Sequence, residues 1–282
     1  MRYLLITADD YGMSRAVNDG IVRGVEAGVI TTANVMTNMP LLQEAGELRR
    51  RFPSLSIGLH WNLTEGKSVL AKEAVATLVD QKGTFFSASE LKRRRREGKI
   101  EDRQVLAELK AQYQKFYEIV GAPDYWNTHE HVHFNFEFFE LFTQAARELG
   151  IQSMRCNRKI PVLSSHPKKR PLKRWLLEPA KRVVMDRWYR RLKAQKVRMP
   201  DGMLNFRNLQ DKCDFEAVVN QIQWGKWQTA ELVLHPATSV DSPHFGNLTE
   251  KRVEEYRYFC RDGLRENLET GGFQLAGYEV LK

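Results

Sequence analysis

The residues best suited to metal and acid–base chemistry fall in four short clusters along this chain. They are an adjacent aspartate pair, a single histidine, a run of alternating histidines and a histidine before a proline: Asp9-Asp10, His60, His129-Glu130-His131-Val132-His133 and His235-Pro236. Imidazole and carboxylate groups together bind Zn²⁺ and several other divalent metals. Three such ligands leave positions open for water, as catalytic sites do, so the pattern predicts metal-dependent hydrolysis.

The aspartate pair has two interpretations. Adjacent carboxylates at a strand end repel each other unless a cation or a shared proton relieves them. Because consecutive strand residues point to opposite faces, Asp9 and Asp10 can take different roles, one towards a metal and one towards a nucleophile. A turn or helix-capping pair explains the two residues equally well when they are considered alone.

The histidines have structural alternatives too. His129, His131 and His133 alternate, so on an extended backbone all three would face the same way. The alternative is a polar strand end whose histidines are satisfied locally. His60 alone is more typical of a structural histidine, but on three strand ends Asp10, His60 and His129 can form one three-ligand face.

His235 is a candidate general acid. It closes the apolar run 232–234, and Pro236 halts further pairing, which places the histidine at the rim of a sheet. An unperturbed pKa of about 6.5 suits proton donation at neutral pH. A rim histidine without function is the alternative.

The sequence contains no phosphate-binding glycine loop, no dinucleotide fingerprint, no serine elbow and no helical H-E-x-x-H motif.

Alternating strand and helix patterns must position these residues. Strands are expected at 2–7, 31–36, 56–60, 125–129, 152–155, 230–235 and 273–277, and helices at 14–28, 41–51, 101–120, 136–149, 214–223 and 249–268. This order predicts a parallel sheet with right-handed crossovers. The candidate residues all fall at C-terminal strand ends, where barrel enzymes build their sites, so one (β/α) barrel domain over 1–282 is favoured.

The net charge of +9 belongs to one segment. Residues 158–198 hold 15 Lys/Arg against two acidic residues, and the rest of the chain carries −4. Interleaved aromatic and aliphatic residues also suit an anionic membrane or nucleic-acid surface, or a lipid-linked or phosphate-bearing glycan. We favour a solvated insertion at about 158–200 or a dimer contact, with no nucleic-acid partner.

Scattered cysteines and the absence of a signal-peptide or membrane-spanning pattern predict a cytoplasmic protein.

Several blocks of sequence resemble the YdjC-like carbohydrate deacetylases. They follow in order along most of the chain, at 5–14, 17–18, 28–33, 36–38, 57–64, 128–133 and 234–236, with the weakest correspondence over about 158–210. The resemblance implies a distorted TIM-like barrel of about seven strands, related to polysaccharide deacetylases. It further implies removal of acetyl groups from N-acetylated sugars, a divalent metal, commonly Mg²⁺ with Zn²⁺ or another ion as the alternative, and a homodimer.

The resemblance also assigns roles to matching residues. The implied metal ligands are Asp10, His60 and His129. Asp9 is expected to act as general base and His235 to protonate the leaving amine. Apart from the resemblance, His131, His133 and Arg155 are candidates for support of the ligands or for contact with substrate. Two alternatives remain: a metal phosphoesterase on a similar barrel, and an anionic-surface binding protein that uses 158–198.

Overall fold

One parallel sheet forms the centre of the computed structural model, which describes residues 2–160, 172–205, 227–240 and 249–281. The strand order is β4-β3-β2-β1-β6-β5, and β7 pairs with the first residues of β1. The bounds are β1 Arg2–Tyr11, β2 Thr32–Val35, β3 Ser56–Trp61, β4 Tyr125–Thr128, β5 Gly202–Asn205, β6 Thr229–Leu234 and β7 Phe273–Leu275. Because all of these strands run parallel, their C-terminal ends meet at the same edge.

The sheet curls towards a barrel because the segment after α5 (Phe139–Glu148) bridges its two edges. Met154 forms a parallel bridge with Trp126 of β4, and Lys159 forms one with Met203 of β5. The strand expected at 152–155 is therefore present only as isolated bridges. The α/β, barrel-like architecture predicted from the sequence is confirmed.

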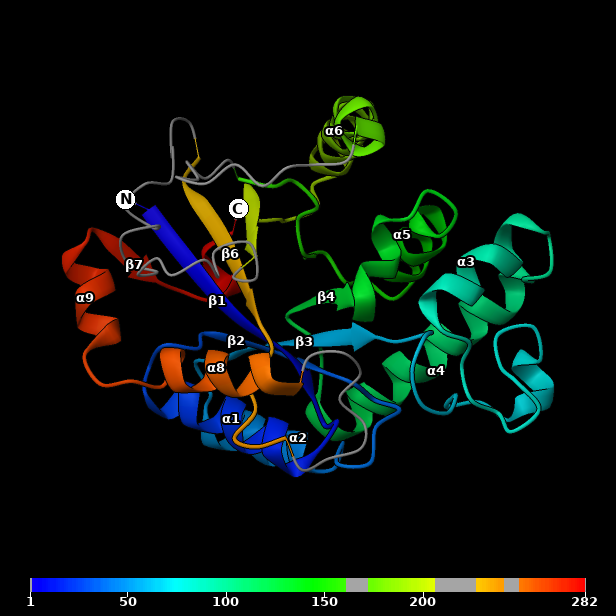
Figure 1. Ribbon diagram of the computed structural model, residues 1–282. Helices are drawn as coiled ribbons and strands as arrows, with labels where there is room; N and C mark the ends of the chain where they lie inside the picture. Colours follow the sequence, from blue (N-terminus) through cyan, green and yellow to red (C-terminus); the bar gives the residue numbers. More distant parts are fainter. Residues whose placement is uncertain (1, 161–171, 206–226, 241–248, 282) are drawn as a thin grey trace.

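Helices surround this sheet (Figure 1). Their bounds are α1 Arg15–Glu26, α2 Glu44–Arg51, α3 Ala88–Arg96, α4 Asp102–Val120, α6 Leu172–Ala194, α8 Thr249–Phe259 and α9 Leu264–Thr270, and the 3-10 helices are η1 Lys72–Val75, η2 His129–Phe134 and η4 Tyr278–Val280. The long helix expected at 249–268 is in fact α8 and α9, because Gly263 adopts φ 75° between them. The helix expected at 214–223 lies outside the described residues.

Burial explains the position of β1 at the centre. Leu4, Leu5 and Ile6 are fully buried, as expected of a parallel strand covered on both faces. The chain then turns into α1, where Ser14 caps the helix by accepting a hydrogen bond from the Val17 N–H at 3.3 Å. The strand end and the helix start together fix the loop that carries the aspartate pair.

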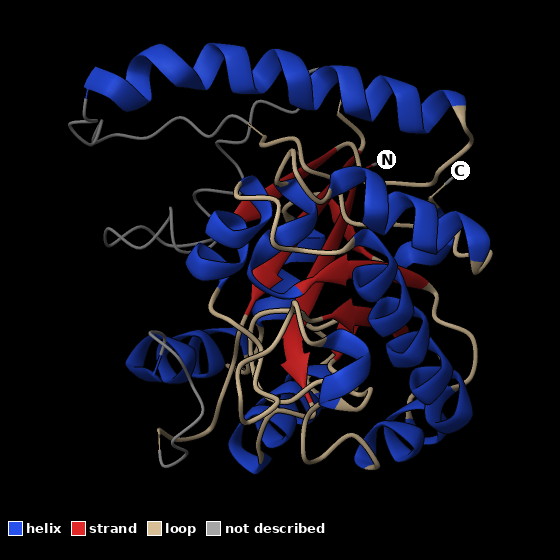
Figure 2. Ribbon diagram, turned by 90° about the vertical axis from the view of Figure 1, so that its right-hand side faces the viewer, coloured by secondary structure: helices blue, strands red, loops and turns tan. Residues whose placement is uncertain are grey.

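The basic segment includes α6, a long helix along one end of the molecule (Figure 2). Trp188 stacks flat on Phe139 of α5, with ring centroids 3.7 Å apart. Arg191 pairs with Glu140 of the same helix at 2.6 Å. The C-terminal half of α6 is thus packed on the domain, and its role as a solvated insertion or a dimer contact stays a prediction. Over the described ranges, no helix has both the length and the apolarity needed to cross a membrane.

Candidate active site

The C-terminal ends of four strands bring the candidate residues to one edge of the sheet. Asp9 and Asp10 lie near the end of β1, and His60 lies near the end of β3. His129 follows β4 directly, and His235 follows β6 directly. This is the placement that the strand-end pattern predicted, and it follows from the parallel direction of the sheet.

Asp10, His60 and His129 offer three ligand atoms that lie within 4.8 Å of one another. Asp10 Oδ1 is 3.2 Å from His60 Nε2 and 3.1 Å from His129 Nδ1. One carboxylate oxygen and two imidazole nitrogens suit a divalent ion with positions left for water. The residues therefore fit the metal that the sequence predicted, and the described part of the chain holds no second group of this kind.

Asp10 reaches this position through an unusual backbone. Its φ is 75°, and the pairing of β1 with β2 shifts register between Ala8 and Tyr11. Such a bulge re-aims side chains at a strand end. The second carboxylate oxygen, Oδ2, accepts a hydrogen bond from Arg252 of α8 at 2.6 Å. Burial alone raises the pKa of Asp10, but Arg252 and the two histidines hold it well below its usual range.

Asp9 has a separate set of partners. Arg155 donates to both of its oxygens, at 2.7 and 2.8 Å, and Asn34 donates to Oδ1 at 2.6 Å. Burial raises the pKa of this carboxyl, but Arg155, with His60 and His235, more than offsets that effect and lowers the pKa below its usual range, so Asp9 is ionised at neutral pH. Arg155 also bonds Glu231 at 3.0 Å, and Tyr278 donates to Glu231 at 3.1 Å. A buried network therefore orients Asp9.

His235 lies close to Asp9 at the same edge. Its Nε2 is 3.8 Å from Asp9 Oδ2, and its side chain is 15% exposed. Its backbone N–H donates to Glu255 of α8. An imidazole and an ionised carboxylate therefore lie beside the three-ligand group, which is the arrangement that acid–base chemistry on a bound substrate requires.

The expected common orientation of His129, His131 and His133 is wrong. The chain from His129 is a kinked 3-10 helix in which Glu130 and His131 have φ of 50° and 54°. His133 turns away to Thr128, whose hydroxyl lies 2.5 Å from its Nδ1. Consecutive left-handed residues replace the extended backbone that the alternation argument assumed, so only His129 joins the ligand group.

Sequence reasoning missed two residues that contact the candidate ligands. Glu65 lies 3.2 Å from His129 Nε2, and Arg252 donates to Asp10. Glu65 directly follows the block 57–64 that carries His60, which is a signal that could have found it. Arg252 gives no comparable signal, because its partner is 242 positions away in the chain.

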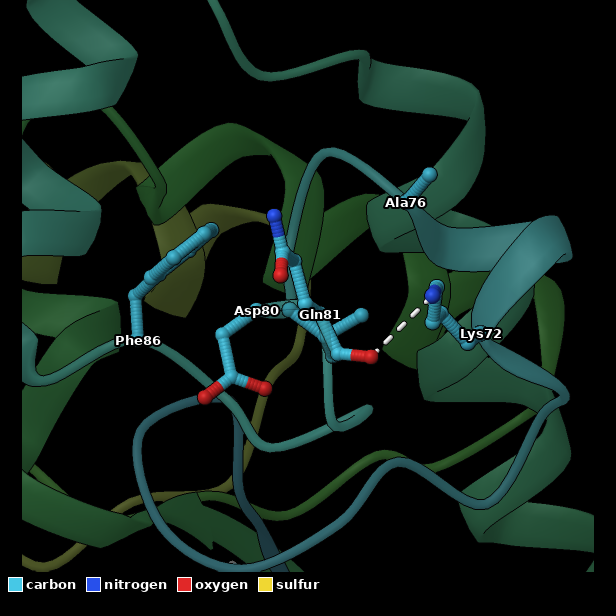
Figure 3. Close-up of a pocket in the computed structure, with 6 residues that line it drawn as sticks. Lys72, Ala76, Asp80, Gln81 and Phe86 are labelled. Carbon is cyan, nitrogen blue, oxygen red and sulfur yellow. Dashed lines mark hydrogen bonds between the residues drawn. The ribbon is translucent and has the colours of Figure 1, made fainter.

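A shallow pocket of about 330 Å³ lies elsewhere, in the long connection between β3 and α4 (Figure 3). Its lining consists of Lys72, Ala76, Val79, Asp80, Gln81 and Phe86. Its polar groups are bonded locally: Lys72 donates to the Gln81 carbonyl at 3.0 Å, and Asp80 accepts from the backbone N–H groups of residues 82 and 84. It shares no residue with the three-ligand group, so the candidate active site is the strand edge.

A curled parallel sheet with an Asp-His-His group at its strand ends defines an α/β protein of the TIM-like class with a candidate metal centre. The model of the YdjC-like protein family matches residues 3–270. The chain therefore belongs to the YdjC-like family, as the sequence blocks predicted.

Individual relatives extend over most of the chain. A carbohydrate deacetylase from Geobacillus stearothermophilus is 29% identical over 279 residues, which cover 98% of this chain and 97% of the relative. A chitooligosaccharide deacetylase from Klebsiella pneumoniae is 29% identical over 164 residues, 58% of this chain and 62% of the relative. A crystal structure from Enterococcus faecalis V583, described as a candidate cellobiose-phosphate cleavage protein, has a TM-score of 0.75 and 26% identity, covering 99% of this chain and 98% of that one.

Proposed function

We propose that this protein is a metal-dependent carbohydrate N-deacetylase, which hydrolyses the acetamide of an N-acetylated sugar to acetate and an amine. The observation that carries the proposal is the position of an ionised carboxylate and a histidine, 3.8 Å apart, beside a three-ligand group. Relatives named carbohydrate deacetylase and chitooligosaccharide deacetylase support this substrate class.

Asp10, His60 and His129 would hold the metal. When bound, a divalent ion supplies a Lewis acid that polarises the acetyl carbonyl and lowers the pKa of water. The resemblance favours Mg²⁺, but two imidazoles are more typical of Zn²⁺ and other transition ions, whereas Mg²⁺ prefers oxygen ligands. A comparison of metals in the assay below decides between them.

Asp9 is the proposed general base. Arg155 keeps it charged. Oδ1 already accepts hydrogen bonds from Arg155 and Asn34, whereas Oδ2 accepts one from Arg155 and retains a lone pair that can accept the proton of an attacking water. The same pairing makes Asp9 a weak base, so its contribution depends on position as well as on proton affinity. Arg155 is accordingly a residue that orients the base.

His235 is the proposed general acid, which gives a proton to the nitrogen of the departing sugar amine. Without that proton the leaving group would be an amide anion, which is too basic to depart. The position of His235 beside Asp9 suits a proton taken up on one side of the acetamide and delivered on the other.

The two remaining histidines take different roles in this proposal. Burial lowers the pKa of His131 to about 3, so the ring is neutral, and its buried Nδ1 has no hydrogen-bond partner among the described residues. We assign it to hydrogen bonding with the substrate. His133, bonded to Thr128, supports the turn.

Homodimerisation and a cytoplasmic location stay predictions from the sequence.

Acetate release from N-acetylglucosamine oligosaccharides tests the function. The protein should release acetate, lose activity with a chelator and regain it on addition of Mg²⁺, Mn²⁺, Co²⁺ or Zn²⁺, and the most effective ion identifies the preferred metal. A parallel assay with sugar phosphate esters tests the phosphoesterase alternative. Chelator-resistant activity, or release of phosphate without acetate, would contradict the proposal.

A further inference from the structure

Each of the two ring nitrogens of His129 faces a carboxylate. Nδ1 lies 3.1 Å from Asp10 Oδ1, within the three-ligand group. Nε2 lies 3.2 Å from Glu65 Oε2, at the other position of the ring. Glu65 is not one of the residues whose ligand atoms gather within 4.8 Å. It therefore contacts the candidate metal centre through His129.

The loop that carries Glu65 is held by amide side chains. Asn62 accepts a hydrogen bond from the Glu65 N–H at 3.1 Å and donates to its carbonyl at 2.6 Å. Asn38 donates to the same carbonyl at 2.8 Å. Gln112 of α4 bonds both the backbone N–H and the carbonyl of Asn62, at 3.0 and 2.7 Å. These hydrogen bonds fix the position of the Glu65 backbone.

The chemistry of imidazole explains why an acceptor at Nε2 matters. A neutral ring has one N–H and one lone pair, so a histidine that binds a metal through Nδ1 carries its hydrogen on Nε2. Histidine ligands almost always donate this second N–H to a carboxylate, a carbonyl or water, which selects the tautomer and raises the basicity of the ligand. Glu65 places a carboxylate oxygen at hydrogen-bond distance from that nitrogen.

We infer that Glu65 is a positioning residue of the metal centre: it accepts the Nε2–H of His129 and leaves Nδ1 to bind the ion beside Asp10. The inference rests on the metal centre proposed above. Glu65 lies outside the three-ligand group and acts through His129, whose tautomer and orientation it sets.

Metal titration of three variants tests this role. Zn²⁺ and Co²⁺ are titrated into the metal-free protein and into Glu65→Ala, Glu65→Gln and Glu90→Gln. Glu90 of α3 is the matched control, since its side chain is 32% exposed against 31% for Glu65, and it pairs with Arg93. Glu65→Ala should bind the metals about 10–100-fold more weakly than the parent. Glu65→Gln should lose less, because its amide oxygen still accepts the N–H, and Glu90→Gln should match the parent.

A spectroscopic measurement separates positioning from general loosening of the loop. In the Zn²⁺-loaded parent, ¹⁵N-histidine NMR should show His129 with a slowly exchanging Nε2 proton, and in Glu65→Ala that proton should exchange quickly. Equal metal affinity in Glu65→Ala and Glu90→Gln, with an unchanged Nε2 proton, would overturn the role of Glu65 alone. A parent that binds neither ion would overturn the metal centre as well, so the two failures are distinguishable.

Discussion

Arg155 holds both carboxylate oxygens of Asp9, with Nη1 2.7 Å from Oδ2 and Nη2 2.8 Å from Oδ1. Both side chains are almost fully buried. Removal of one partner from a buried ion pair leaves the other charge without compensation. We therefore expect Arg155→Met to lower the free energy of unfolding by about 3–5 kcal/mol, measured by chemical denaturation. Arg191→Met, at an exposed pair, is the control and should cost about 1 kcal/mol or less. A similar small loss in both would contradict the prediction.

Asp9 and His60 should separate catalysis from metal binding. Asp9→Asn removes the proposed base but no ligand, so we expect turnover to fall by about 10²–10⁴-fold with the metal affinity retained. His60→Ala removes a ligand and should weaken both. Acetate release and isothermal titration with the metal measure the two effects. Equal loss of metal in the two variants would disprove the assignment of roles.

His235 should matter only when the leaving group needs a proton. We expect His235→Asn to lower deacetylation of an N-acetylated sugar by about 10²–10⁴-fold, with the metal affinity unchanged. The ester p-nitrophenyl acetate loses p-nitrophenolate, a leaving group that departs without protonation. The same variant should therefore hydrolyse that ester nearly as fast as the parent. If the ester and the amide lose activity to the same extent, His235 is not the acid.

Metal binding should release a proton from His129. Burial alone lowers the pKa of this ring, but Asp10 and Glu65 together raise it to about 10, so the metal-free protein carries His129 protonated at neutral pH. The ion must displace that proton, and affinity should rise with pH until about 10. Calorimetry at pH 7 in two buffers of different ionisation enthalpy should show about one proton released per metal. Buffer-independent heats would contradict this.

The same shift predicts how the stability of the metal-free protein depends on pH. Because the pKa of His129 is raised on folding, its contribution is complete below the unfolded value of about 6.5 and is lost as pH rises through about 10. Thermal unfolding of the metal-free protein should show this alkaline loss. The His129→Gln variant should lack that component, and an identical pH dependence in both proteins would contradict the assignment.

The sequence by itself determined most of the strands and what stands at their ends. It predicted no strand at β5, and the strand expected at 152–155 is present only as isolated bridges. The apolar run of β1 stops at an aspartate pair. β3 ends one residue after His60, and β4 and β6 end directly before His129 and His235, because a buried strand changes to polar residues where it reaches the rim. Parallel direction, implied by the β/α alternation, then gathers those ends at one edge. Asp10, His60 and His129 follow from these two local properties.

Only the tertiary structure decided which atoms meet. Alternation assumes an extended backbone, and the left-handed turn at Glu130 and His131 breaks it just after the candidate ligand His129. Arg252 reaches Asp10 from a helix near the other end of the chain, and Glu65 reaches His129 from a loop held by Asn38 and Asn62. Hydrophobic periodicity indicates the burial of one segment at a time. These contacts form only because the curled sheet brings segments that are distant in the chain together at one edge.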